Sequence, residues 1–161
     1  MRKIIIGFVA ALILAGGSIA MPSAQAARPT AAVISGSVAP APATRAISPL
    51  RGSAPFKFGT KRYSKWYARH YMKTRYGWKK RQYRALVKLF EHESGWSHRS
   101  ANRSSGAYGI PQALPAHKLS QAGRDWRTNP EPQIRWGLKY IKSRYGTPKR
   151  AWAAWTSKRW Y

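Results

Sequence analysis

Apolar residues recur at helical spacing through the second half of the chain, most clearly over residues 80–94. The positions at i, i+3, i+4 and i+7 of that segment form one apolar face, made by Tyr83, Leu86, Val87 and Phe90. Ser94-Gly95 and the polar run over residues 97–105 then interrupt the pattern. The pattern therefore predicts an amphipathic helix that begins near Lys80 and ends at Ser94-Gly95.

Three further segments show helical signals. Residues 66–75 place aromatic and basic side chains at helical spacing, and Tyr76-Gly77-Trp78 breaks the pattern. Asn129-Pro130 forms an N-cap and first helical residue, and an apolar stripe follows until Gly146. Thr147-Pro148 repeats the same start signal before Trp152 and Trp155. The stripe consists of Ile134, Leu138, Ile141 and Tyr145.

The segment between the helix over residues 80–94 and the helix that starts at Asn129-Pro130 lacks this helical pattern. Gly106 and Gly109 bracket two residues in a way typical of a tight loop or short hairpin, and Pro111 and Pro115 limit the residues after it to short turns. We therefore expect a mainly α domain over residues 57–161, with irregular structure between Gly95 and Asn129.

The first 56 residues differ from this domain. Arg2 and Lys3 precede an apolar stretch, and Ala24-Gln25-Ala26 fits a small-x-small cleavage site, so residues 1–26 are predicted to be a signal peptide. An uncleaved membrane anchor is the alternative. Residues 27–56 are rich in Ala, Pro, Ser and Thr, which predicts a linker or a propeptide. The protein is thus expected to be secreted, and to be extracellular or associated with the cell wall.

Charge narrows the possible chemistry. The chain has 161 residues, with 30 Lys and Arg against 4 Asp and Glu, and it has no Cys. Thiolate sites and disulfides are excluded, and carboxylate-rich metal sites are disfavoured. His92-Glu93 begins like a zinc-binding His-Glu-x-x-His helix, but position 96 is Trp. We therefore expect no metal and no cofactor.

The four acidic residues can be placed individually. On a helical wheel with Leu86 at zero, the apolar face centres near about 50°, Glu93 lies at about −20° and Glu91 at about 140°. Glu93 is therefore expected on the core-facing side, where burial raises the pKa of a carboxyl and suits it to act as a general acid. A buried Glu satisfied by backbone N–H groups or by an Arg is the structural alternative. Glu91, Asp125 and Glu131 are expected to offset nearby Lys and Arg.

The loop after Glu93 sharpens this interpretation. Glu93-Ser94 is followed by Ser104-Ser105-Gly106-Ala107-Tyr108-Gly109-Ile110-Pro111-Gln112. In this combination, from about Tyr67 to the end, the sequence resembles soluble-type lytic transglycosylases, which are related to goose-type lysozyme, and most of all small secreted actinobacterial versions. The family's third motif, Ala-Tyr-Asn, falls on Ala154-Trp155-Thr156, so only its aromatic character is kept.

The resemblance implies a lysozyme-like fold and a specific activity. Members of the family cleave the β-1,4 bond between N-acetylmuramic acid and N-acetylglucosamine with a single Glu, here Glu93, and leave 1,6-anhydromuramic ends. Some relatives carry a Cys pair that would fall on Ala85 and Lys149, so packing alone is expected to hold the last helix here. The residues expected to contact substrate are Ser94, Ser105, Tyr108, Gly109, Gln112, Trp155 and Tyr161, the last two by stacking on sugar rings. Structural roles are the alternative for Ser94 as a helix cap, for Gly109 in a turn, and for Tyr108 and Gln112.

Other functions remain open on sequence alone. A hydrolytic muramidase of the same fold would use the same Glu. A non-catalytic cationic protein could bind anionic wall polymers through net charge. Basic and aromatic residues over 57–84 also suit single-stranded nucleic acid, although an export signal argues against a specific nucleic-acid partner. A function as a membrane-active cationic segment has less support in the sequence than any of these. We expect a monomer that has no transmembrane segment after signal cleavage and that acts on peptidoglycan glycan strands.

Overall fold

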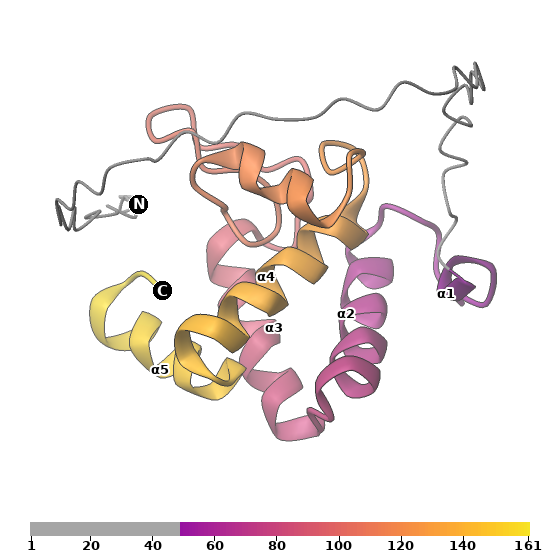
Figure 1. The fold of residues 1–161 in the computed structure, drawn as a ribbon, viewed down its shortest axis with the longest axis horizontal. Coiled ribbons are helices and arrows are strands. Elements are labelled where there is room, and N and C mark those ends of the chain that lie inside the picture. The colour runs from indigo at the N-terminus through magenta and orange to yellow at the C-terminus, as the bar shows by residue number, and fades with distance from the viewer. Residues whose placement is uncertain (1–48) are drawn as a thin grey trace, which may run out of the picture. The chain divides into compact units, whose positions relative to one another are not determined.

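The computed structural model describes residues 49–161, so the predicted signal peptide and most of the predicted linker lie outside the described residues. Within the described part the fold is mainly helical, as predicted, and it contains no strands (Figure 1). The elements are α1 (Pro49–Gly52), α2 (Lys61–Tyr76), α3 (Lys80–Ser94), the 3-10 helix η1 (Ala116–Ala122), α4 (Pro130–Tyr145) and α5 (Pro148–Lys158).

The helix ends lie where turn and cap residues predict them. Gly77 and Gly95 adopt left-handed conformations that end α2 and α3, with φ of 65° and 58°. The side chain of Asn129 accepts a hydrogen bond from Glu131 N at the start of α4, and that of Thr147 accepts one from Arg150 N in α5. The predicted starts of α3, α4 and α5 and the predicted ends of α3 and α4 are confirmed.

Helix α4 contacts α2, α5 and η1, and α3 packs against α5 (Figure 1). The main core lies between these helices, and a smaller cluster lies under the irregular segment, formed by Ala113, Leu119 and Trp126. Each large apolar side chain fully buried in this way contributes on the order of 1.5–3 kcal/mol to folding. The irregular segment thus has its own small core rather than resting loosely on the helices.

The buried face of α3 differs from the predicted one. Tyr83 and Val87 are only half-buried. The buried positions are Ala85, Leu86, Leu89 and Phe90. These four centre at about −30° on the helical wheel, rather than near 50°. Glu93 therefore points closer to the middle of the buried face than predicted.

Two connections correct expectations about the ends of the domain. In α1, inside the stretch predicted as a linker, Leu50 packs against the core and Arg51 reaches Glu131 at 3.5 Å. Residues before 57, inside the stretch predicted as a linker or propeptide, therefore contact the helical domain. At the other end, the backbone N–H of Lys149 donates to Gln82 Oε1 at 2.9 Å. This bond to α3 supplements packing in holding α5.

Candidate active site

Glu93 is the second-last residue of α3, at the point where the helix ends and the irregular segment begins. The backbone N–H groups of Gly95 and Trp96 donate to the carbonyls of Glu91 and Phe90 at 2.9 and 3.3 Å. Trp96 itself is 1% exposed and has a φ of 62°, so its side chain fixes the direction in which the chain leaves the helix. Glu93 is therefore carried on a well-anchored helix end.

The carboxyl of Glu93 is partly buried, and burial is the largest cause of a raised pKa. Because water is excluded from the charged form, the pKa of Glu93 rises from 4.5 to about 7. A hydrogen bond from the Trp155 side chain acts in the opposite direction and lowers the pKa. Neither cause involves a second carboxylate. The group can therefore carry a proton close to neutral pH and then hold a negative charge once that proton has left.

Trp155 brings α5 to this carboxyl. Its indole N–H is the only donor of that side chain, so the hydrogen bond to Glu93 fixes which edge of the ring faces the carboxyl. Its ring stacks on Trp152 at 5.3 Å and 7° and lies 4.5 Å from the His92 ring. The guanidinium of Arg159 lies 5.4 Å from the Trp155 ring centroid. The half-buried Trp155 thus keeps a polar donor, and not only aromatic character, at the place of the family's Tyr.

Ser94 joins the end of α3 to the irregular segment. Its Oγ donates to Ile110 O at 2.9 Å and lies 3.4 Å from Phe90 O. The first bond crosses to the loop and the second stays within the helix. The side chain thus fixes the loop next to Glu93, and any contact with substrate stays a prediction.

Gln133 was not predicted, although it organises the irregular segment. It is fully buried in α4, and its Oε1 accepts a hydrogen bond from Ile110 N at 2.8 Å. Its Nε2 donates to Trp126 O and His98 O at 2.6 and 2.9 Å. Gln133 lies four residues before the buried Gly137, on a face of α4 that packs inward, and no sequence signal singled out this buried polar residue.

Gly109 is required by this arrangement. Its φ is 76°, and an added Cβ would lie 2.4 Å from Gln133 Oε1. Its N–H donates to Ser100 O at 2.7 Å. Gly106 also has a positive φ, 79°, but nothing lies within 4 Å of a Cβ built there. Gly109 is thus needed for close packing, whereas Gly106 serves a turn.

Three other predicted substrate contacts lie in the same loop. Half-buried Tyr108 donates through its hydroxyl to Arg127 O at 3.1 Å and packs edge-on against Trp126. The Oγ of Ser105 accepts from Ala107 N at 3.3 Å. Gln112 is only 5% exposed, and its Nε2 donates to Gly109 O at 3.0 Å. This corrects the expectation for Gln112, because its amide donors bond within the loop instead of facing a groove.

Tyr161 corrects a second expectation. Its side chain is 2% exposed, and its hydroxyl donates to Pro111 O at 3.1 Å. The ring packs against Tyr140 and Tyr145, and the charge of Glu93 helps to raise its pKa. A ring buried in this way has no free face for a sugar. Tyr161 instead supports the loop through its hydrogen bond to Pro111 O.

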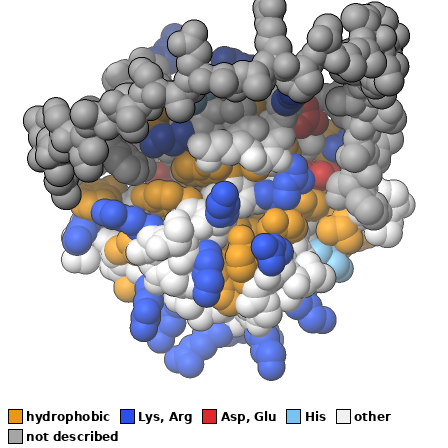
Figure 2. Space-filling view, in the orientation of Figure 1, with side chains coloured by type: hydrophobic (Ala, Val, Ile, Leu, Met, Phe, Trp, Pro, Cys, Tyr) orange, Lys and Arg blue, Asp and Glu red, His pale blue; other side chains and the backbone are white. Residues whose placement is uncertain are grey.

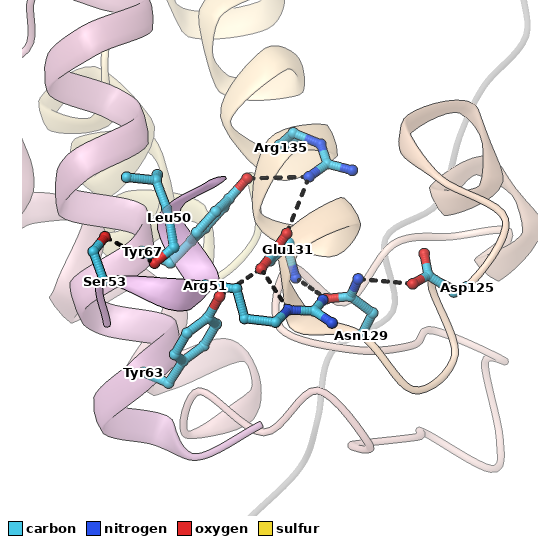
Figure 3. A network of polar contacts seen from close by, with 9 residues as sticks. All are labelled: Leu50, Arg51, Ser53, Tyr63, Tyr67, Asp125, Asn129, Glu131 and Arg135. Atoms are coloured by element: carbon cyan, nitrogen blue, oxygen red, sulfur yellow. Dashed lines mark hydrogen bonds and ion pairs between the residues drawn. The ribbon is translucent and has the colours of Figure 1, made fainter. Parts of the chain in front are cut away.

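The remaining acids have other partners. Glu91 is exposed and pairs with Lys65 at 3.0 Å, and Asp125 accepts from Asn129 at 2.8 Å. Glu131 is 2% exposed and joins a network that Figure 3 shows. Tyr63 donates to its carboxylate, and its two Arg partners are Arg51 at 3.5 Å and Arg135 at 3.7 Å. Offsetting of nearby cations is confirmed for Glu91 and Glu131, and Glu131 also connects α1, α2 and α4.

The surface over these elements is strongly cationic. Figure 2 shows Lys and Arg side chains spread over the drawn face with hydrophobic side chains between them. Across residues 49–161 no three His, Cys, Asp or Glu side chains lie close enough to hold a metal ion. None of the described helices is long and apolar enough to span a bilayer.

Comparison with known proteins identifies one family. The family model described as "Transglycosylase SLT domain" matches residues 70–157, more than half of the chain. The matched part runs from the middle of α2 almost to the end of α5 and includes Glu93, the loop around Gly109 and Trp155. No curated protein and no solved structure matches the chain.

Proposed function

Because the chain belongs to the transglycosylase SLT domain family, we propose that it cleaves the glycan strands of peptidoglycan with Glu93 as its single catalytic acid and base. Membership makes it a lytic transglycosylase of the lysozyme-like superfamily and implies a peptidoglycan substrate. The proposal adds the bond and the product: the β-1,4 linkage between N-acetylmuramic acid and N-acetylglucosamine, and 1,6-anhydromuramic ends.

The observation that carries the proposal is the environment of Glu93. Burial raises its pKa to about 7, so a large fraction of the carboxyl is protonated at neutral pH and available as a general acid. Glycosidases that use two carboxylates hold them about 5–10 Å apart. Here the pKa of Glu93 responds to burial and to Trp155, with no contribution from another carboxylate. A route that needs only one carboxylate suits this site.

In that route Glu93 acts twice. Its proton passes to the glycosidic oxygen while the bond between that oxygen and C1 of the muramic residue breaks, so N-acetylglucosamine leaves with a free hydroxyl. The resulting carboxylate then takes the proton from the C6 hydroxyl of the same muramic residue. The C6 oxygen bonds to C1 and closes the 1,6-anhydro ring, which restores protonated Glu93 without water.

The Trp155 indole helps the first half of this cycle more than the second. A hydrogen bond donated to a carboxylate is stronger than one donated to a neutral carboxyl. Trp155 therefore stabilises the carboxylate that forms as Glu93 gives its proton to the glycosidic oxygen. Its partly exposed ring, stacked on Trp152, also remains the best candidate for sugar stacking among the predicted residues.

Digestion of purified peptidoglycan tests the proposal. The full chain and its Glu93→Gln variant are incubated with the same sacculi, and released fragments are identified by mass spectrometry. Anhydromuramic ends from the unmodified protein and none from Glu93→Gln support the proposal. Reducing ends would replace it with a hydrolytic muramidase. An absence of fragments, or equal release by the variant, would leave a cationic wall-binding protein or another catalytic residue.

We further propose that the protein is exported and bound to the wall by charge. The apolar N-terminal stretch and its cleavage pattern support export, and the formal net charge of +26 supports attraction to anionic wall polymers. Such attraction weakens with salt, because exposed charges are screened beyond about 10 Å at 0.1 M ionic strength. Charge would thus concentrate the enzyme on its substrate, while Glu93 carries out the cleavage.

A further inference from the structure

A cavity lies where α2, η1 and α4 meet, and none of the predicted sugar-site residues lines it. Its volume is about 440 Å³, within the range typical of ligand sites. Between α2 and α4, Figure 2 shows hydrophobic side chains flanked by Lys and Arg. The cavity is therefore a second place, besides the surroundings of Glu93, where a ligand could bind this domain.

The lining of the cavity is cationic. Four basic side chains line the cavity and no Asp or Glu does; they are Arg75, Arg135, Lys139 and Lys142. The three on α4 are spaced i, i+4 and i+7, so they share one face that extends about 10 Å along the helix. Both lysines are exposed, and in the described part of the chain neither forms an ion pair. This spacing suits a ligand with several negative charges along its length.

Arg135 gives the cavity a fixed element. Its guanidinium donates to Tyr67 Oη at 3.1 Å and to Ala122 O at 2.6 Å, and lies 3.7 Å from Glu131. Glu131 is shared with Arg51, so one carboxylate faces two guanidinium groups and positive charge remains. Arg135 is thus oriented before any ligand binds, whereas Lys139 and Lys142 are free to follow it.

Aromatic side chains complete the lining. Tyr71, Tyr76 and Trp136 are all partly exposed there, and Tyr71 packs edge-on against Tyr76 at 6.2 Å. Rings of this kind provide apolar faces for the C–H groups of a sugar or polyol, while their polar atoms remain accessible. The combination of cations and flat rings matches a chain in which charged groups alternate with carbon-rich units.

We propose that this cavity binds a phosphodiester polymer of the cell wall, with polyol or sugar units against the rings and phosphates against Lys139 and Lys142. The choice of a wall polymer over a nucleic acid rests on the proposed function, because an enzyme acting on peptidoglycan meets wall polymers at its substrate. The site holds the enzyme on the wall independently of Glu93, and this binding adds to the general attraction due to net charge.

The test is binding of a fluorescently labelled glycerol-phosphate oligomer to the full chain, measured by anisotropy. Lys139→Gln/Lys142→Gln should weaken binding about tenfold or more and reduce the slope of log Kd against log salt by about 1 to 1.5. Lys88→Gln/Lys149→Gln removes the same charge from exposed positions on α3 and α5 and should change Kd less than about twofold. Ser143→Trp adds bulk to the cavity without changing charge, and should also weaken binding.

Equal effects of the two double variants would overturn the proposal, because net charge alone would then explain binding. A labelled oligothymidine that binds more tightly, with the same dependence on Lys139 and Lys142, would assign the cavity to nucleic acid instead.

Lys142 also lies in the last turn of α4, where a cation stabilises the helix dipole. The free energy of unfolding in urea is therefore measured for each variant. Binding that is lost only in step with stability would contradict a binding role. Cleavage of polymer-free peptidoglycan should be unchanged in Lys139→Gln/Lys142→Gln. A failure of this binding proposal is therefore distinguishable from a failure of the proposed role of Glu93.

Discussion

Replacing Glu93 by Gln should make the protein more stable, and only above acidic pH. The substitution keeps the shape of the side chain and an acceptor for the Trp155 indole, but it removes the ionisable group. A carboxyl whose pKa is raised by burial favours the protonated form of the folded state. The folded protein therefore loses stability whenever the solution forces that group to ionise.

The size of the effect follows from the two pKa values. Below about pH 4.5 the carboxyl is protonated in the folded and unfolded chain, and it contributes nothing to pH dependence. From about 4.5 to 7 the unfolded chain ionises first, so stability falls as pH rises, and above about 7 the loss is complete. A shift from 4.5 to about 7 corresponds to roughly 3 kcal/mol at about 1.4 kcal/mol per unit, and partial solvent exposure reduces this to about 2–3 kcal/mol.

Urea unfolding followed by tryptophan fluorescence measures this difference. We expect Glu93→Gln and the unmodified protein to have the same free energy of unfolding near pH 4, and the variant to be more stable by about 2–3 kcal/mol near pH 8. Glu91→Gln is the matched control, since it makes the same change two residues away on an exposed ion pair with Lys65. It should lower stability by less than about 1 kcal/mol.

A Glu93→Gln variant that is no more stable near pH 8 than near pH 4, relative to the unmodified protein, would contradict this pH dependence. That result would mean that the folded protein solvates the ionised carboxylate as well as water does. Glu93 would then have an ordinary pKa and no special fitness as an acid at neutral pH.

Four further substitutions test the surroundings of Glu93, the loop and the Glu131 network. Trp155→Phe removes the donor that lowers the pKa of Glu93, so the fall of kcat/KM at alkaline pH should move to higher pH and kcat should drop; an unchanged pH profile would contradict the contact. Gly109→Ala should cost more than about 2 kcal/mol in urea unfolding and Gly106→Ala about 1 kcal/mol, because only the first meets a buried side chain; equal costs would show that φ alone matters. Glu131→Ala should lower the free energy of unfolding by about 3–5 kcal/mol by leaving two Arg side chains without their buried partner, and a loss below about 1 kcal/mol would show that the network is solvated.

The helices of this fold could be read from the sequence because their ends depend on local chemistry. Gly95, Asn129 and Thr147 act within one turn of their own position, so no tertiary information was needed to place them. The prediction of the face that α3 buries was less accurate, because it was based mainly on large residues. Tyr83 lies at the rim, whereas Leu89 is fully buried against neighbours that the sequence alone does not position.

The candidate site also has features that could be predicted from the sequence and features that could not. The burial of Glu93 could be predicted from its position on the helix, and its catalytic role stays a prediction. The roles of Gln133 and Tyr161 could not, because each depends on contacts 23 and 50 residues away, with Ile110 and Pro111. The burial of Gln112 was missed for the same reason: its amide bonds to a loop whose path is set by α4.

The protonation state of Glu93 in the folded protein is the central claim, and a carbon-13 NMR titration of its side-chain carboxyl measures it directly. The chain contains only Glu91, Glu93 and Glu131 as glutamates, so glutamate labelling gives few signals, and the one lost in Glu93→Gln is thereby assigned. The account predicts a midpoint at about pH 7 for this signal. A midpoint near 4.5, the ordinary value for a solvated glutamate, would contradict it.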